Sequence, residues 1–325
     1  MSAHIPEANK NGIKELNIII DEASALGLKV ILDVSKPMMA NFKIPKNIYS
    51  LRLDWGFSLD DVISMSQEDY LIDLNASIIK EEDLLYLKTK EVNFNKLRAS
   101  HNFFPKPYTA LTHEDVLEIN IMYKKYGIPV LAFIPSNINK RPPIYEGLPS
   151  IEEHRHLSLY AITSELSLLE IDEICFGDAF CSIEELKIAT DFITDELIIP
   201  ISINKGISPI EIDILKRKQI QRKDANAYFV RSSIRENNEI MPFNTVIRRK
   251  KDITIDNVNF ARYQGEVGIM KQDLEQDLRV NVVGHALISD FLLMRIKPNQ
   301  KFNFIIVGDE NGKSNYLGGF RGQQN

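Results

Sequence analysis

"LRLDWGFS", residues 51–58, alternates apolar and charged side chains along its first four positions. Side chains of an extended strand point to opposite faces in turn, so Leu51 and Leu53 face one way while Arg52 and Asp54 face the other. One face of this predicted strand is therefore apolar and the other is charged. An open parallel sheet that packs helices on both faces has no place for such a charged row.

Short apolar strands and amphipathic helices alternate along the first 196 residues. The predicted strands are "KVILDVS" (29–35), "SLRLDWG" (50–56), "YLIDLNAS" (70–77), "KLRASHNFF" (96–104), "PVLAFIPS" (129–136) and "EICFGDAF" (174–181), with a further candidate in "SAHIP" (2–6). The predicted helices include 13–27, 113–127 and 182–193. Serial alternation of this kind indicates a parallel sheet, either a (β/α)8 barrel or a doubly wound open sheet.

The polar faces of three predicted strands favour the barrel. The polar pairs that alternate with apolar residues are Asp33 with Ser35, Arg52 with Asp54, and Asp73 with Asn75. A barrel needs apolar residues only toward its outer helices, so these polar side chains can line its lumen. We therefore expect an α/β fold with a TIM-type (β/α)8 barrel.

Depth in the lumen separates structural from functional candidates. Deep charges must be paired to offset their desolvation, and Arg52 with Asp33 and Asp73 has the composition for a structural network. Asp54, Asn75 and Ser35 lie one layer nearer the carboxyl ends of the strands, where barrel enzymes keep their catalytic groups. We therefore interpret Asp54 as a functional candidate.

The pattern changes after residue 196 to short β-like runs separated by charged turns. The runs are "ELIIPISIN", "NAYFVRSS", "DITIDN", "RVNVVGHAL" and "KFNFIIVG". This change predicts a barrel domain over 1–196, a mainly β domain over 197–310, and a Gly- and Asn-rich flexible tail over 311–325.

Composition describes an ordinary soluble protein. The 325 residues are 44% hydrophobic and carry a net charge of −6, which gives no reason to expect nucleic acid as a partner. The two cysteines are too few for a disulfide scaffold, and no apolar run is long enough to span a bilayer. We expect a cytoplasmic location without membrane contact, and homo-oligomerisation stays open.

Three loops after predicted strands concentrate polar groups at one mouth, at 100–112, 140–156 and 176–180. Asp54, Glu146 and Asp178 could supply the two carboxyl groups that glycoside hydrolysis requires. The alternative for Asp178 or Glu146 is a capping role, or an ion pair with Arg141 or Arg155.

The remaining candidates in these loops are histidines and cations. We expect His101 to hydrogen-bond a sugar, and neither His101 nor His154 lies in a metal-binding pattern. Arg141 and Arg155 could bind a phosphate or carboxylate, or belong to a solvated face. No P-loop or Gly-x-Gly-x-x-Gly motif is present, so no nucleotide cofactor is expected.

At these motifs the chain resembles the bacterial 6-phospho-N-acetylmuramidase family, long described as outer surface protein homologues. The segments that carry the resemblance are "HIPE" (4–7), "LRLDWGF" (51–57), "LNAS" (74–77), "HNFFPKP" (101–107), "AFIPS" (132–136), "YEGLPSIEEHR" (145–155), "GD" (177–178), "RSS" (231–233), "TIDN" (254–257) and "RYQGE" (262–266). They run over nearly the whole chain. The resemblance implies a TIM-like barrel followed by a cyclophilin-like β domain.

The resemblance also implies a function and a set of positions. The expected activity is cytoplasmic hydrolysis of 6-phospho-N-acetylmuramyl-N-acetylglucosamine in cell-wall recycling, so the expected partner is a phosphorylated amino-sugar disaccharide. The positions where family motifs meet strand ends, or which would bind the phosphate, are Asp54, Asn75, His101, Asn102, Glu146, His154, Asp178, Arg141 and Arg155. The roles of the individual carboxylates stay open.

One departure from the family pattern is at the start of the sequence. In the family, "HIPE" lies at the end of the second barrel strand, whereas here it follows three residues after the start. About one and a half βα units would then be absent, and we expect an N-terminally truncated sequence. The alternatives are a decayed paralogue that binds phosphosugar without turnover, and peptidyl-prolyl isomerase activity of the β domain.

Overall fold

The computed structural model describes residues 12–39, 42–190, 192, 195–224, 226–232 and 236–307, and the side chains of residues 12–14 are outside this description. The candidate strand at 2–6, "HIPE" at 4–7 and the predicted tail at 311–325 therefore lie outside the described residues.

Contacts between Cα atoms divide the chain into two compact units. The first comprises Met1–Arg155 with Leu169–Cys181, and the second comprises His156–Leu168 with Ser182–Asn325. The boundary predicted at residue 196 coincides with the first residue of strand β7 (Glu196–Ile203). The two helices that precede this strand, α6 (Leu159–Leu166) and α7 (Ile183–Thr190), group with the second unit.

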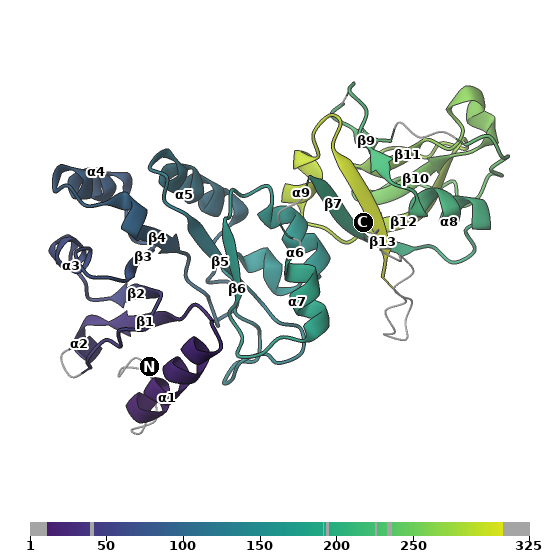
Figure 1. The fold of residues 1–325 in the computed structure, drawn as a ribbon. Helices are drawn as coiled ribbons and strands as arrows, with labels where there is room; N and C mark the ends of the chain where they lie inside the picture. Colours follow the sequence, from purple (N-terminus) through teal and green to yellow (C-terminus); the bar gives the residue numbers. More distant parts are fainter. Residues whose placement is uncertain are drawn as a thin grey trace, which may run out of the picture. The chain divides into compact units, whose positions relative to one another are not determined.

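A six-stranded parallel sheet forms the centre of the first unit. Its strands follow sequence order and are β1 (Ile31–Ser35), β2 (Ser50–Trp55), β3 (Leu71–Asn75), β4 (Leu97–Ser100), β5 (Val130–Ile134) and β6 (Glu173–Phe176). All six strands predicted from the alternation of residues 29–181 are confirmed. The sheet is curled like half a barrel (Figure 1). Within the described residues β1 and β6 do not pair, so the full eight-stranded closure expected from the sequence is not observed.

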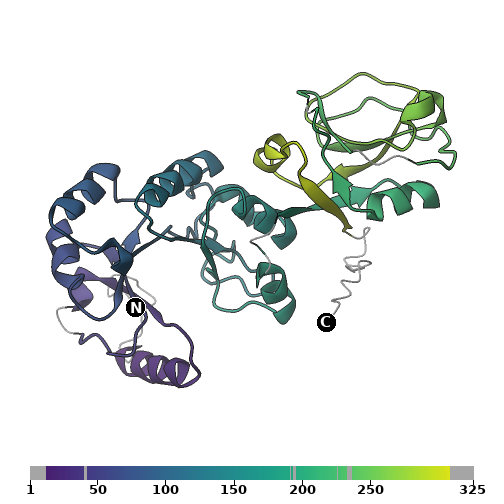
Figure 2. The ribbon, with the colours of Figure 1, turned by 45° about the horizontal axis from the view of Figure 1, so that its top comes forward.

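Helices connect the strands of the first unit, and two of them begin at side-chain caps. They are α1 (Gly12–Ala25), α2 (Lys36–Met39), α3 (Leu59–Met65), α4 (Glu81–Thr89), α5 (His113–Lys125) and the 3-10 turns η1 (Phe94–Lys96) and η2 (Glu152–Arg155). Ser58 caps α3 and Thr112 caps α5, each in a reciprocal capping box with an aspartate three residues later. Figure 2 shows α3, α4 and α5 along the outer side of the curl.

The strand register produces the two faces that the sequence predicted. Parallel pairing sets Arg52 beside Asp33 and Asp73, and sets Asp73 beside Arg98. The apolar residues between them, such as Leu51 and Ile72, are fully buried. The polar residues therefore follow one another across the sheet on one face, while the apolar residues form the opposite, buried face.

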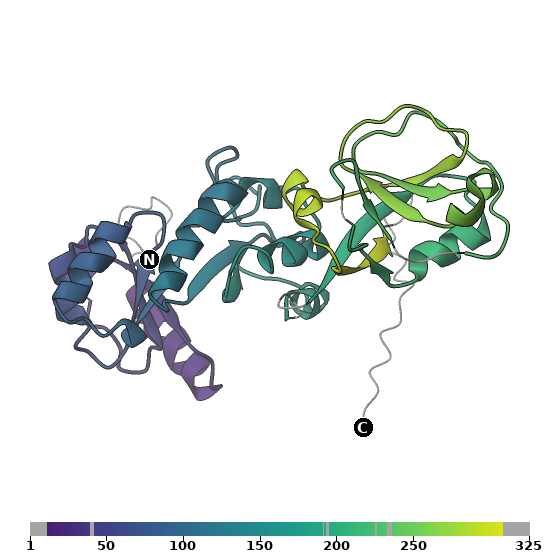
Figure 3. The same cartoon turned by 90° about the horizontal axis from the view of Figure 1, so that it is seen from above.

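The second unit contains a seven-stranded, mostly antiparallel sheet with a barrel-like curl (Figure 3). In spatial order its strands are β8 (Gln219–Ile220), β13 (Lys301–Ile306), β7 (Glu196–Ile203), β12 (Val280–Ala286), β10 (Asp252–Asp256), β11 (Val267–Met270) and β9 (Phe229–Arg231). The helices are α6 (Leu159–Leu166), α7 (Ile183–Thr190), α8 (Pro209–Lys216), α9 (Asp290–Arg295) and the 3-10 segment η3 (Val258–Tyr263). The five predicted β runs are present, and β8 and β11 were not predicted.

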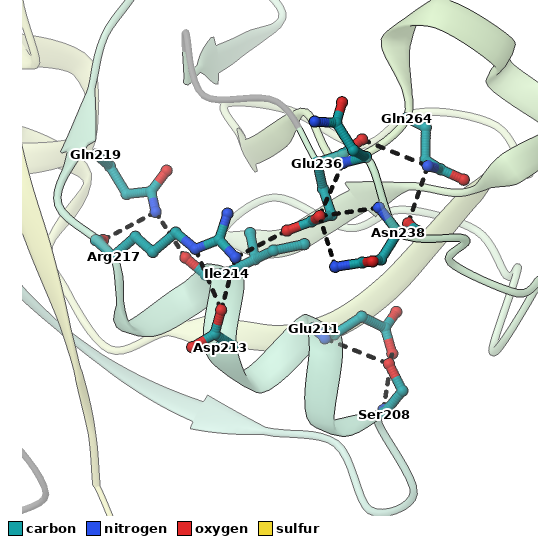
Figure 4. Close-up of polar contacts among 10 residues, drawn as sticks. Ser208, Glu211, Asp213, Ile214, Arg217, Gln219, Glu236, Asn238 and Gln264 are labelled. Atoms are coloured by element: carbon teal, nitrogen blue, oxygen red, sulfur yellow. Dashed lines mark hydrogen bonds and ion pairs between the residues drawn. The ribbon is translucent and has the colours of Figure 1, made fainter.

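Polar contacts fix the segment that follows β9 against α8 and against the turn before β11 (Figure 4). Arg217, just after α8, donates hydrogen bonds from Nη2 to Asp213 at 2.6 Å and to Glu236 at 2.8 Å. Gln264 donates from Nε2 to the carbonyl oxygen of Asn238 at 3.0 Å. These contacts give the chain around residues 236–240 a defined path without regular secondary structure.

The chain contains no membrane-spanning helix within the part that the structure describes, because none of its helices there is long and apolar enough.

Candidate active site

Arg52 is the centre of a polar cluster at the carboxyl ends of β1, β2 and β4. Its guanidinium donates from Nη1 to Asp33 Oδ2 at 3.0 Å and from Nη2 to Asn102 Oδ1 at 2.6 Å, and Asp54 Oδ1 lies 3.6 Å from Nη1. The Arg52 side chain is only 4% exposed, whereas that of Asp54 is 33% exposed. A buried cation thus fixes a carboxylate that still reaches solvent.

A cavity of about 430 Å³ adjoins Asp54. It is lined mainly by the turn after β2 and by the ends of β3, α3 and α4, and its polar groups include Asp54, Ser58, Asn75 and Asp83. The indole of Trp55, the only tryptophan of the chain, borders it and is largely exposed. A mostly apolar hollow with a few polar groups on its wall is typical of a small-molecule site.

Asn75 is held by its own loop at the edge of this cavity. Its side-chain oxygen accepts a hydrogen bond from the backbone of Ser77 at 3.1 Å, and its side-chain nitrogen lies 3.5 Å from the carbonyl oxygen of Asp54. The structure therefore brings Asn75 and Asp54 together, and Arg52 joins Asn102 to the same cluster.

A second ion-pair cluster lies one layer deeper. Arg98 Nε is 3.1 Å from Asp73 Oδ2 and Arg98 Nη2 is 2.6 Å from Glu173 Oε2, while the Ser100 hydroxyl donates to Asp73 at 2.7 Å. The expected pairing of Arg52 with Asp33 is confirmed, but the ion pair of Asp73 is with Arg98. The side chain of Arg52 reaches instead to Asn102, which leaves Arg98 as the cation at the level of Asp73.

The buried carboxyl of Asp73 should make folding stability depend on pH. Burial raises the pKa of Asp73 to about 6, because the side chain is inaccessible and its Oδ1 has no hydrogen-bond partner among the described residues. The folded state then binds more protons than the unfolded state between pH 3.8 and about 6. Asp73 therefore contributes most to the free energy of unfolding below pH 3.8. This contribution falls by on the order of 3 kcal/mol as the pH rises to about 6.

Urea unfolding between pH 4 and pH 7 checks this prediction by comparison with Asp73→Asn. The variant should lose the decline in stability that Asp73 causes. His101 contributes with the opposite sign, because burial lowers the pKa of its imidazole to about 4, so stability from His101 rises with pH across that range. Parallel pH profiles for the variant and the native chain would contradict the assignment to Asp73.

Asp178 organises the loop after β5. Its two carboxylate oxygens accept backbone N–H bonds from Ser136 at 2.9 Å and from Arg141 at 2.7 Å, and the side chain is buried. At Gly177, a Cβ atom would lie 2.3 Å from the carbonyl oxygen of Leu148, so only glycine allows this close approach. These contacts correspond to the capping alternative for Asp178, and no contact of the described residues joins it to Asp54.

Glu146 and Arg141 lie on the same loop, with different environments. The Glu146 carboxylate is half-buried and makes no hydrogen bond or ion pair with any described residue. Arg141 is exposed, and its guanidinium lies 5.7 Å from the centre of the Phe103 ring. Phe103 follows Asn102 directly in the sequence, so the contact with its ring places Arg141 near Asn102. Arg141 has no carboxylate partner among the described residues. The loops beyond the strand ends therefore carry one carboxylate, Glu146, and one cation, Arg141.

Arg155 is a structural cross-link. Its side chain is fully buried and binds Glu152 through two hydrogen bonds, of 2.7 Å from Nε and 3.0 Å from Nη2. The same guanidinium donates to the carbonyl oxygens of Phe104 and Gly147 at 3.0 Å each. Arg155 therefore ties two loops to η2, and its donors are directed into the protein.

The two candidate histidines are also buried. His101 bonds through Nε2 to Asn120 of α5 at 2.8 Å, and the ring of His154 packs edge-on against His113 with centroids 5.3 Å apart. Alternation along β4 gives the reason for His101: it shares the helix-facing side with Leu97 and Ala99, whereas Asn102 faces Arg52. The structure does not bring His101 into the Asp54 cluster.

The fold and the site together define a class of protein. A curled parallel α/β sheet carries a carboxylate, two amides and a buried arginine at the carboxyl ends of its strands, beside a cavity. This is the arrangement of a mixed α/β protein that carries a candidate small-molecule site on a half-barrel sheet.

Comparison with known families identifies the particular group. Residues 1–191 match the model of 6-phospho-N-acetylmuramidase, N-terminal, and residues 197–305 match that of 6-phospho-N-acetylmuramidase, C-terminal. The chain belongs to the 6-phospho-N-acetylmuramidase family. A search of curated proteins finds no match.

Two solved structures resemble the whole chain. A conserved protein of unknown function from Enterococcus faecalis is 26% identical, with a TM-score of 0.71, covering 94% of this chain and 87% of that one. An uncharacterized protein from B. cereus is also 26% identical, with a TM-score of 0.76, covering 90% of this chain and 88% of that one. These similarities extend over both units and support the fold. They carry no evidence about an activity.

Proposed function

We propose that this protein is a glycosidase that hydrolyses the bond between 6-phospho-N-acetylmuramic acid and N-acetylglucosamine. The observation that carries the proposal is the Arg52-held, partly exposed carboxylate of Asp54 beside the 430 Å³ cavity, in a chain of the 6-phospho-N-acetylmuramidase family. We further propose that the first unit belongs to the TIM-barrel class. The reaction would serve cell-wall recycling in the cytoplasm.

Hydrolysis of a glycosidic bond requires two carboxyl groups, one as the acid and the other as the base or nucleophile. Asp54 is the first of these in our proposal. Glu146 is the better candidate for the second, because its carboxylate has no partner in the described residues, whereas both oxygens of Asp178 already accept backbone N–H bonds. Asp178 then acts as a positioning residue for the loop that carries Glu146 and Arg141.

The remaining polar groups would bind substrate. Asn75 and Asn102 present amides beside Asp54, suited to sugar hydroxyl or acetamido groups. Arg141 is the exposed guanidinium of the mouth loops and would pair with the 6-phosphate, since its fork matches phosphate oxygens. Arg155, His101 and His154 support the site by packing and hydrogen bonding in the interior.

The test is release of N-acetylglucosamine from the 6-phosphorylated muramyl disaccharide by the 325-residue chain, with the unphosphorylated disaccharide as the control substrate. We expect turnover that depends on the phosphate. Arg141→Ala should raise KM for the phosphorylated substrate about 10- to 100-fold, because a hydrogen bond to a charged group contributes ~1.5–3 kcal/mol. Binding of the phosphorylated disaccharide without any release would instead support a phosphosugar-binding protein that does not catalyse hydrolysis.

A further inference from the structure

The second unit contains a cavity of its own, of about 300 Å³. It lies on the side of strands β9, β10, β11 and β12 that faces away from their hydrophobic core. Alternation shows this clearly in β10, where Ile253 and Ile255 belong to the core while Thr254 and Asp256 line the cavity. The cavity is therefore not a packing defect of the core.

Three sequence segments that carry the family resemblance in this unit converge on this one cavity. "RSS" contributes Arg231, "TIDN" contributes Thr254 and Asp256, and "RYQGE" contributes Tyr263 and Glu266. The proposed hydrolysis uses residues of the first unit alone. These three segments therefore share one site within the second unit.

Five charged side chains line the cavity: Arg231, Arg248, Asp256, Glu266 and Asp277. Arg231 binds Glu266 through two hydrogen bonds, of 2.7 Å from Nε and 3.2 Å from Nη2, and the Glu266 side chain is only 6% exposed. Asp277 is paired with Arg279 at 2.8 Å. Their ion pair fixes Arg231 and Glu266 in place. Three carboxylates against two arginines give the wall no excess of positive charge, which favours a neutral polar ligand over a phosphate.

Aromatic rings and a hydroxyl complete the cavity wall. Phe229, Phe260 and Tyr263 line it and are each half-buried. The Thr254 hydroxyl has no hydrogen-bond partner among the described residues. A Cβ atom at Gly268 would lie 2.6 Å from that hydroxyl and 3.4 Å from the Phe229 ring, so the glycine leaves room for both groups.

The turn that carries Tyr263 and Glu266 is held in place from behind. Gly265 has φ +81°, and a Cβ atom there would lie 2.6 Å from the backbone nitrogen of Glu236, so the two chain segments are in close contact at this glycine. Gln264 accepts a hydrogen bond from the backbone of Ile240 at 3.2 Å. A wall held in this way is organised before a ligand arrives, which lowers the entropy cost of binding.

We propose that this cavity is a non-catalytic binding site for the neutral ring of an N-acetylated amino sugar. The C–H faces of such a ring would pack on the aromatic side chains, and its hydroxyls would bond to Thr254 and to the paired Arg231 and Glu266. The volume is at the lower end for ligand sites and fits a single ring. The choice of an N-acetylated amino sugar rests on the proposed function, whereas binding by the second unit is measured separately from hydrolysis by the first.

The test uses the full chain and N-acetylglucosamine as the probe, with binding measured by calorimetry and Trp55 fluorescence measured in parallel. Trp55 is the only tryptophan and borders the cavity of the first unit, so its emission reports on that unit. We expect a saturable heat of N-acetylglucosamine binding that persists in Asn75→Ala, in which the first site is altered. This binding event should leave the Trp55 emission unchanged. Glucose 6-phosphate should not compete for this event.

Variants of the second cavity make the assignment specific. Thr254→Val, which keeps the shape and removes the hydroxyl, and Tyr263→Leu should each weaken binding about 5- to 10-fold. Thr190→Val is the matched control, because among the described residues that hydroxyl, on α7, bonds only within its own helix. The proposal is overturned by the absence of saturable heat, by heat that Asn75→Ala abolishes and the cavity variants leave unchanged, or by occupation of the cavity by a proline-containing peptide in place of the sugar.

Discussion

Asp54→Asn is expected to lower kcat for the phosphorylated disaccharide by about 10²- to 10⁴-fold, the usual contribution of a positioned acid or base. Asparagine has nearly the same shape but cannot exchange a proton or act as a carboxylate nucleophile. Asp54 is 33% exposed and lies 3.6 Å from Arg52, which keeps its stronger hydrogen bonds to Asp33 and Asn102. The local structure should therefore survive, and KM should change little.

The measurement is steady-state kinetics on the native chain, Asp54→Asn and a control, Asp69→Asn. Asp69 is an exposed aspartate in the turn before β3, and removal of its charge should leave kcat unchanged. Trp55 is the neighbour of Asp54, so an unaltered emission spectrum shows that the site has kept its structure. Native-like kcat in Asp54→Asn would remove this residue from the mechanism, while a matching loss in Asp69→Asn would point to a general charge effect.

Arg98→Met is expected to lower the unfolding free energy of the first unit by about 3–5 kcal/mol. The side chain of Arg98 is 3% exposed and lies between Asp73, which is inaccessible, and Glu173. Methionine leaves the Asp73 carboxylate buried and without its cation. Glu173 is 42% exposed and can turn to solvent, so the cost arises mainly at Asp73.

Urea unfolding followed by Trp55 fluorescence measures this effect on the first unit, because the only tryptophan lies on β2. A cost of this size shifts the midpoint by about 1–5 M urea, since m-values in urea are about 1–3 kcal/mol per M. The double variant Arg98→Met with Asp73→Leu should recover much of the loss, since an apolar pair of similar volume avoids the buried charge. A shift below about 0.3 M in Arg98→Met would show that the ion pair contributes little net stability.

The strands could be predicted because local alternation and local propensity agree along them. In β2, Leu51 and Leu53 are buried as their positions require, and Arg52 and Asp54 face the polar side. The same rule applied to β4 places His101 with Leu97 and Ala99, so the burial of His101 was accessible from the sequence although a loop role was expected. The short strands β8 and β11 were missed because they depend on pairing with distant strands rather than on their own pattern.

The partners of charged side chains could not be predicted at the same level. Arg98 and Arg52 are both near Asp73 in the register, and only the side-chain paths decide that Arg98 forms the ion pair. Arg155 and Arg141 were equal candidates for an anion site in the sequence. The structure separates them, because the carbonyl groups of two loops converge on Arg155 while Arg141 stays at the surface.

The sequence by itself determined the strand faces, the change of pattern at residue 196 and, through its ordered segments, the family. These follow from periodicity and residue identity, which act over a few neighbouring positions. Only the tertiary structure decided that Arg52 joins Asp33, Asp54 and Asn102, that Asp178 holds a loop, and that three segments of the second unit share one cavity. The physical reason is that hydrogen bonds and desolvation depend on which distant residues meet, and chain folding alone brings them together.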